Sequence, residues 1–153
     1  MKVCLGGTFY PFHKGHKELL RKAFQVAGAQ GSVFIGLTAP TMITKKGKIA
    51  SFEKRKQTIM QFLDEEHVLP RVSLQPLLDK YGPTIEDDFD AIVVSPETKI
   101  TAEEINRKRT ALGKKPLRII IIPFVLSEDR LPISSSRIRR KEINENGKRA
   151  TQD

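Results

Sequence analysis

Two histidines near the N-terminus stand three residues apart in a glycine-rich segment. The segment GGTFYPFHKGH, residues 6–16, follows the short apolar run MKVCL and precedes an amphipathic pattern. His13 and His16 are therefore expected on one side of the first turn of a helix, and Gly15 between them leaves room for a bulky ligand. Helix N-termini attract phosphate through free amide groups and the helix dipole, and two imidazoles there are good donors to an oxyanion.

Two alternative roles for the histidine pair stay open at this point. Metal binding needs at least a third ligand, which His67, Cys4 or a carboxylate at unknown distance would have to supply. A purely structural role, such as a helix cap, would need no ligand at all. We expect phosphate binding and no protein metal site.

A second phosphate-binding segment is predicted near the C-terminus. ISSSRIR, residues 133–139, places Ser134, Ser135 and Ser136 at the start of an expected helix, with Arg137 just inside it. A helix N-cap needs only one serine. Three serines followed by arginine suit a cradle of amides, hydroxyls and guanidinium. Neither a G-x-G-x-x-G fingerprint nor a P-loop motif is present.

The composition is that of one globular domain. The chain has 153 residues, is 39% hydrophobic and 29% charged, and carries a net charge of +9. Its apolar runs fall short of the ~20 residues of a membrane span, and we expect neither a signal peptide nor a membrane partner. Cys4 is the only cysteine, so an intrachain disulfide is excluded and a cytoplasmic location is expected. The basic excess suggests a polyanionic partner.

Short apolar runs alternate with helical patterns along the chain. Strands are expected at residues 2–6, 32–38, 71–77, 90–95 and 117–125, and helices at 17–28, 51–65, 101–113 and 134–147, with a short one at 82–88. This alternation predicts an α/β fold, a Rossmann-like doubly wound sheet of about five parallel strands with helices on both faces. The run 117–125 is the most hydrophobic and is placed mid-sheet. One domain should span 1–147, with a polar tail at 148–153, and ligands should bind at the carboxyl ends of the strands.

These motifs resemble those of a known family. GTF…HKGH together with ISSSRIR resembles the paired signatures of the nucleotidyltransferase superfamily, H-x-G-H or T-x-G-H and I-S-S-T-x-(I/V)-(R/K), with Ser136 in place of the usual Thr. With YGPT at 81–84, SPET at 95–98 and the pattern of Ile105, Asn106 and Arg109, the chain resembles phosphopantetheine adenylyltransferases of the archaeal and eukaryotic type over about residues 2–147. Bacterial members carry Arg-Gly-x-Arg where this chain has SPET.

The resemblance implies a reaction of coenzyme A biosynthesis. AMP would pass from ATP, carried with Mg²⁺, to 4′-phosphopantetheine by in-line attack on the α-phosphate, giving dephospho-coenzyme A and pyrophosphate. The attacking phosphate monoester is largely dianionic at neutral pH, so no general base is required. Nicotinamide mononucleotide and FMN adenylyltransferases of the same superfamily are the alternatives. A basic nucleic-acid-binding module is the alternative of another class, although only 7% of residues are aromatic.

The resemblance also implies roles for individual residues. The catalytic residues would be His13 and His16 on the α-phosphate and Lys45 on the acceptor phosphate, with Lys46 not excluded. The ATP-binding set would be Gly7, Thr8, Phe9, His16, Asn106, Ser134, Ser135, Ser136 and Arg137. The acceptor-binding set would be Thr8, Lys45, Lys46, Ser95 and Arg109. The expected partners are these two small molecules rather than nucleic acid, and the oligomeric state is left open.

Overall fold

A parallel β-sheet forms the centre of the protein. The computed structural model describes residues 1–43, 49–128, 130, 131, 133, 138 and 143–148. The strands are β1 (Lys2–Gly7), β2 (Ser32–Thr38), β3 (Val72–Leu77), β4 (Ala91–Val94) and β5 (Arg118–Ile121). They are ordered β3-β2-β1-β4-β5 and all pairings are parallel. The predicted doubly wound α/β fold is thereby confirmed.

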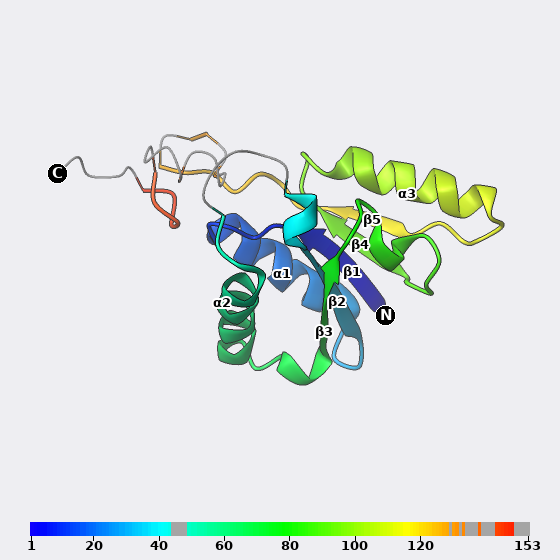
Figure 1. Cartoon of the computed structure of the whole chain (residues 1–153), viewed down its shortest axis with the longest axis horizontal. Coiled ribbons are helices and arrows are strands. Elements are labelled where there is room, and N and C mark those ends of the chain that lie inside the picture. The colour runs from blue at the N-terminus through cyan, green and yellow to red at the C-terminus, as the bar shows by residue number, and fades with distance from the viewer. Residues whose placement is uncertain (44–48, 129, 132, 134–137, 139–142, 149–153) are drawn as a thin grey trace.

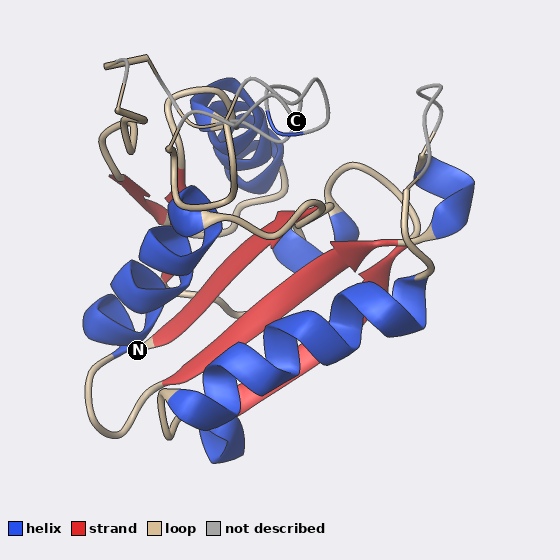
Figure 2. Ribbon diagram, turned by 90° about the vertical axis from the view of Figure 1, so that its left-hand side faces the viewer, coloured by secondary structure: helices blue, strands red, loops and turns tan. Residues whose placement is uncertain are grey.

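Helices cover both faces of this sheet. α1 (Lys14–Ala27) and α2 (Phe52–Glu65) pack on one face, and α3 (Lys99–Ala111) packs on the other (Figures 1 and 2). Alternate residues of β1 serve the two layers, since Val3 and Leu5 join the core under α1 and α2 while Cys4 joins the core under α3. Short 3₁₀ turns at Pro40–Met42, Leu69–Arg71 and Gly82–Thr84 complete the connections. No described helix is long and apolar enough to cross a membrane.

The ends of the helices follow local capping chemistry. Ser51 caps α2 by accepting a hydrogen bond from the Lys54 amide, and Gly28, at φ 81°, ends α1, both as the sequence indicates. α1 begins earlier than residue 17, because His13 acts as its N-cap. α3 also begins earlier, after Thr98 rather than after Thr101.

Two predicted elements differ in part from the structure, and residues 134–137 and 139–142 of the second lie outside the described residues. The isoleucine-rich run 117–125 supplies β5, which is only 118–121 and lies at the edge of the sheet, where Ile121 is 42% exposed. Strand order depends on how the connections wind around β1, so the most apolar strand need not be central. The predicted helix 134–147 does not extend to its expected end, because residues 144–148 form a turn in which the Gly147 amide donates to the Asn144 carbonyl at 2.9 Å.

The winding direction reverses at β1. This strand pairs with β2 on one side and with β4 on the other. In open parallel sheets the carboxyl ends of the strands flanking such a reversal leave a crevice for ligands. The segment that carries His13 and His16 leaves β1 at this point, so the fold places the histidine pair where a ligand site is expected.

Candidate active site

His13 and His16 together cap the first turn of α1. The Nδ1 atom of His13 accepts from the amides of Gly15 and His16, at 3.0 and 3.4 Å, and Nδ1 of His16 accepts from the His13 amide at 3.2 Å. The Lys14 amide donates to the Glu145 carbonyl at 2.9 Å. The amides that the sequence offered to a phosphate are therefore already occupied. A helix cap and a phosphate site are not alternatives here, because the cap leaves the far side of each ring free to serve a ligand.

The cap also determines where the imidazole protons lie. A neutral imidazole that accepts at Nδ1 carries its proton on Nε2, so each ring presents an N–H donor on its far side. The two rings stack, with centroids 3.7 Å apart and planes 21° apart. A Cβ at Gly15 would lie 2.8 Å from Cε1 of His13, so Gly15 makes room for this ring rather than for a ligand.

Burial keeps both histidines uncharged. It lowers the pKa of His13 to about 4. Burial, and secondly the proximity of His13, lowers the pKa of His16 to about 2. An imidazolium cannot accept a hydrogen bond at Nδ1, so protonation would also break the cap. At neutral pH the site therefore holds two side-by-side neutral N–H donors.

The lowered pKa values predict that acid weakens the fold. Between pH 7 and pH 5 His13 and His16 become protonated in the unfolded state but stay unprotonated in the folded state. The free energy of unfolding should therefore fall, by roughly 2 kcal/mol for each histidine at pH 5. Urea unfolding at both pH values measures this fall.

Asparagine is a favoured N-cap, so His13→Asn should keep the start of the helix. The variant should lose the contribution of His13 to the fall in unfolding free energy between pH 7 and pH 5. His67→Asn is the matched control, because His67 is exposed at φ 60°, a conformation that asparagine tolerates. An identical fall between pH 7 and pH 5 in His13→Asn and in the wild type would contradict the assignment.

Aromatic rings hold His16 in place. The Phe9 ring lies 5.0 Å from the His16 ring, and the Phe12 ring stacks on it at 5.7 Å. Phe9 is buried at φ 52°, and a Cβ on Gly7 would meet its ring at 3.3 Å. The segment GGTF thus folds tightly back on itself, and Gly7 and Phe9 shape the site by packing against each other.

Thr8 lies at the end of a hydrogen-bonded chain. Its hydroxyl oxygen accepts from the hydroxyl of Thr38 at 2.9 Å. The Arg55 guanidinium donates from Nη1 to the Thr8 carbonyl at 3.3 Å and from Nε to the Ala50 carbonyl at 2.9 Å. Arg55 is 1% exposed, so its guanidinium is buried where it makes these bonds.

Sequence reasoning missed Thr38 and Arg55 as site residues. The signal for Arg55 is its position on α2, in the same helical stripe as the buried residues Ile59, Phe62 and Leu63. An arginine on the core side of an amphipathic helix is expected to be buried and bonded. Thr38 has a weaker signal, as a hydroxyl at the last position of a predicted strand next to the glycine-rich segment.

An apolar cavity of about 190 Å³ opens beside the carboxyl ends of β1, β2 and β4. Gly7 and Thr38 line it, and α3 supplies Ala102 and Ile105 to its wall. Near it, the Tyr81 hydroxyl donates to the Glu104 carboxylate at 2.8 Å, and Lys80 donates to the same carboxylate at 2.9 Å. The cavity suits an elongated ligand that is mostly apolar and has a few polar groups.

Ser95 begins the turn after β4, at the same end of the sheet. Its amide donates to the Thr98 hydroxyl at 3.1 Å, and Thr98 lines the apolar cavity. The structure therefore brings the predicted residue Ser95 to the edge of the site.

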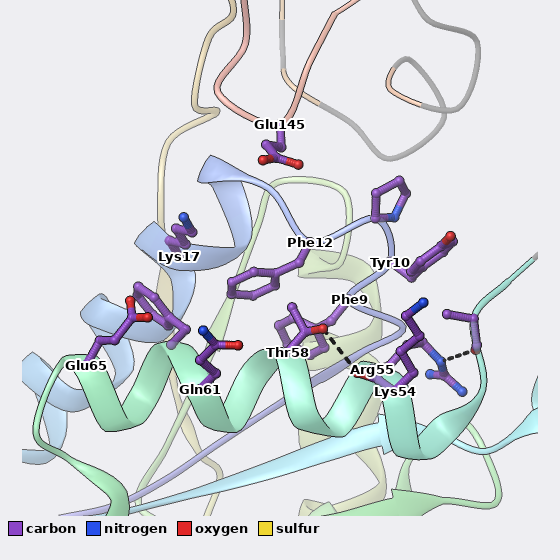
Figure 3. A pocket seen from close by; sticks show the side chains of 13 residues that line it. Phe9, Tyr10, Phe12, Lys17, Lys54, Arg55, Thr58, Gln61, Glu65 and Glu145 are labelled. Atoms are coloured by element: carbon purple, nitrogen blue, oxygen red, sulfur yellow. Dashed lines mark hydrogen bonds between the residues drawn. The ribbon is translucent and has the colours of Figure 1, made fainter.

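A second cavity lies between α1 and α2 (Figure 3). Its volume is about 370 Å³, and it has aromatic and charged walls. Phe9 and Phe12 line it, and the same two rings contact His16. They form a wall that the second cavity shares with the histidine pair.

The predicted residues Asn106 and Arg109 make hydrogen bonds to backbone groups around α3. The side chain of Asn106 pairs with the backbone of Leu117, accepting from its amide at 2.8 Å and donating to its carbonyl at 2.9 Å. Arg109 is 3% exposed and donates to backbone carbonyls of Thr84, Ile85, Asp87 and Lys115. Both side chains tie α3 to its neighbours, and neither lines either of the two cavities described above.

Several predicted residues lie outside the described part of the chain. They are Lys45, Lys46, Ser134, Ser135, Ser136 and Arg137. Within the described residues, no group of three or more His, Cys, Asp or Glu side chains gathers to hold a metal ion. The described site combines neutral histidine donors, threonine hydroxyls and aromatic rings with the buried guanidinium of Arg55.

Comparison with known proteins gives consistent matches. The profile of the family described as cytidylyltransferase-like matches residues 4–141. The chain is 45% identical over 148 residues to the phosphopantetheine adenylyltransferase of Methanosarcina acetivorans, covering 96% of this chain and 94% of that protein.

Solved structures share the fold. A protein of unknown function from Archaeoglobus fulgidus superposes with a TM-score of 0.68 at 34% identity, over 80% of this chain and 89% of that one. A candidate nicotinate-nucleotide adenylyltransferase from Vibrio parahaemolyticus superposes with a TM-score of 0.55 at 13% identity, over 95% of this chain and 82% of that one. At that identity the second match bears on the fold alone.

Proposed function

Because the chain belongs to the archaeal type of phosphopantetheine adenylyltransferases within the cytidylyltransferase-like family, we propose that it transfers AMP from ATP to 4′-phosphopantetheine through His13 and His16. The products are dephospho-coenzyme A and pyrophosphate, and the reaction is a step of coenzyme A biosynthesis. The observation that carries the proposed roles is the reciprocal cap, which leaves two neutral N–H donors side by side at the end of β1.

The α-phosphate of ATP binds these two donors in this proposal. An oxygen of the acceptor phosphate attacks the α-phosphorus in line, the bond to the pyrophosphate oxygen breaks, and pyrophosphate leaves with its electron pair. Donors fixed before the reaction stabilise the charge that develops on the α-phosphate oxygens, because they need no reorganisation. The acceptor phosphate is already deprotonated at neutral pH, so the site needs no proton acceptor.

The acceptor has an elongated arm with apolar and amide groups, and the 190 Å³ cavity offers a matching shape and chemistry. Its phosphate would lie near Thr8, where Gly7 and Thr38 line the cavity. Lys45 or Lys46 would contact this phosphate, while Ser134, Ser135, Ser136 and Arg137 would bind the β- and γ-phosphates. Mg²⁺ enters bound to ATP and belongs to the substrate.

The test is pyrophosphate release by the purified protein with ATP and Mg²⁺. The acceptors to compare are 4′-phosphopantetheine, nicotinamide mononucleotide and FMN, with a reaction lacking acceptor as the blank. We expect release with 4′-phosphopantetheine alone. Release only with another acceptor would overturn the substrate while keeping the roles of the histidines, and no release with any acceptor would overturn the proposed function.

A further inference from the structure

We propose that Thr38 and Arg55 are positioning residues that fix the Thr8 hydroxyl as a hydrogen-bond donor to the acceptor phosphate. The inference rests on the proposed function for the identity of that phosphate. The register of the sheet brings the two threonines together. Gly7 of β1 pairs with Leu37 of β2, and Thr8 and Thr38 directly follow these two residues in the sequence.

Two hydrogen bonds meet at the Thr38 hydroxyl. A guanidinium has five donors and no acceptor, so the Thr38 oxygen accepts from Nη1 of Arg55, which lies 3.4 Å away. In the structure the Thr38 hydroxyl itself donates to the Thr8 oxygen at 2.9 Å. Thr8 accepts this bond, so its own proton is available to another acceptor. No described residue accepts that proton, and it is left for a ligand.

Arg55 also fixes the backbone at the same place. Its Nη1 donates to the Thr8 carbonyl, and its Nε donates to the Ala50 carbonyl before α2. One side chain therefore connects the end of β1, the end of β2 and the start of α2. Because both the carbonyl and the hydroxyl partner of Thr8 are bonded to Arg55, Thr8 has little freedom to turn its hydroxyl elsewhere.

The buried charge of Arg55 is consistent with an anionic ligand at this point. No described carboxylate pairs with Arg55, and its Nη2 atom is buried with no hydrogen-bond partner. A buried charge without a counter-ion is costly, and proteins keep one where it serves a ligand or a network. The substrates that meet beside Thr8 are polyanions, so their arrival supplies negative charge where the protein has an unbalanced positive one.

A double-mutant cycle on Thr8 and Thr38 tests this proposal. Thr38→Val keeps the shape of the side chain and removes its hydroxyl, whereas Thr38→Ser keeps the hydroxyl. We expect Thr38→Val to lower kcat/KM for 4′-phosphopantetheine about tenfold, and Thr38→Ser to stay within about twofold of the wild type. The double variant Thr8→Val with Thr38→Val should be no less active than Thr8→Val alone, because Thr38 acts through Thr8.

Controls separate positioning from a general loss of stability. Thr110→Val removes an exposed hydroxyl on α3 and should change neither activity nor thermal stability. Calorimetric titration with 4′-phosphopantetheine measures Kd for the same single and double variants, so the cycle is tested a second time without relying on turnover. A merely structural role would lower the thermal midpoint of Thr38→Val, and its effects on kcat/KM would multiply with those of Thr8→Val.

The outcomes distinguish this inference from the proposed function. If the wild type turns over and binds 4′-phosphopantetheine but the effects of the two substitutions multiply, the positioning role is wrong and the function stands. An unchanged kcat/KM in Thr38→Val has the same meaning. If the wild type neither binds nor adenylylates 4′-phosphopantetheine, both are overturned.

Discussion

Replacing His16 by glutamine is expected to lower kcat about 100- to 1,000-fold, the loss that accompanies removal of one fixed donor to a developing oxyanion. His16 is the third residue of α1 and accepts from the amide of the N-cap residue. Glutamine at this position of a capping box can accept the same bond, so the helix start should survive. The variant exchanges the Nε2–H of a ring held by Phe9 and Phe12 for the amide of a flexible side chain, so a donor is present but no longer fixed. The fold is kept, and steady-state pyrophosphate release measures the result.

His16→Ala provides the comparison that separates the two roles of this side chain. It should lose turnover to the same extent as His16→Gln, and it should additionally lose about 1 kcal/mol of stability because the cap is gone. His67→Asn should match the wild type in both measurements. If His16→Ala keeps more than a tenth of the wild-type kcat, the imidazole is not a principal donor to the reacting phosphate.

Replacing Arg109 by methionine is expected to produce the largest loss of stability, about 3 kcal/mol or more. Methionine can fill the volume of the aliphatic stem, but it cannot donate to the four backbone carbonyls that the guanidinium serves. Those buried acceptors would remain without partners. Urea or thermal unfolding measures the loss, and activity is assayed at a temperature where the variant is still folded.

The same variant decides between two roles for Arg109. With a structural role, kcat/KM of the folded variant should stay close to the wild-type value while its unfolding midpoint falls. Arg107→Met is the matched control, since Arg107 lies exposed on the same helix and should be replaceable without loss of stability. A raised KM for 4′-phosphopantetheine at unchanged stability would instead restore Arg109 as an acceptor-binding residue.

Periodicity and turn chemistry carried most of the fold prediction. The apolar runs marked every strand, and Ser51 and Gly28 marked helix ends where the structure has them. The position of β5 could not be predicted in this way, because a hydrophobic run reports burial along the chain and not which strands become neighbours. Strand order depends on how each connection crosses the sheet, which is a property of the assembled structure.

The candidate site was predictable only where local motifs define it. His13 and His16 were found because glycine, histidine and a helix start occur within a few residues. Arg109 was predicted to bind the acceptor and Arg55 was not singled out, because the number of charges in a sequence does not tell which of them are buried. Arg55 could have been recognised from its helical spacing with buried apolar residues, whereas the bonds of Arg109 join segments that only the folded chain brings together.

The sequence also predicted free amides at the start of α1, and the structure corrects this. The two histidines occupy those amides themselves, so the same side chains build the helix start and offer the donors. A motif shows which residue types are present. Which imidazole nitrogen accepts the cap bond and which carries the proton depends on the conformation of the turn. That division is what makes a cap and a phosphate site compatible.

The bond from the Lys14 amide to the Glu145 carbonyl has a consequence for how the protein is made. It joins the beginning of the first helix to a segment near the other end of the sequence. Closing a loop of that length is entropically costly, and contacts between distant segments form late in folding. While the chain is still emerging from the ribosome, α1 lacks the partner of its first amide. The nascent protein can therefore assemble its sheet and its histidine cap before the last amide at the start of α1 finds its partner, and the complete helix start should be among the last features it acquires.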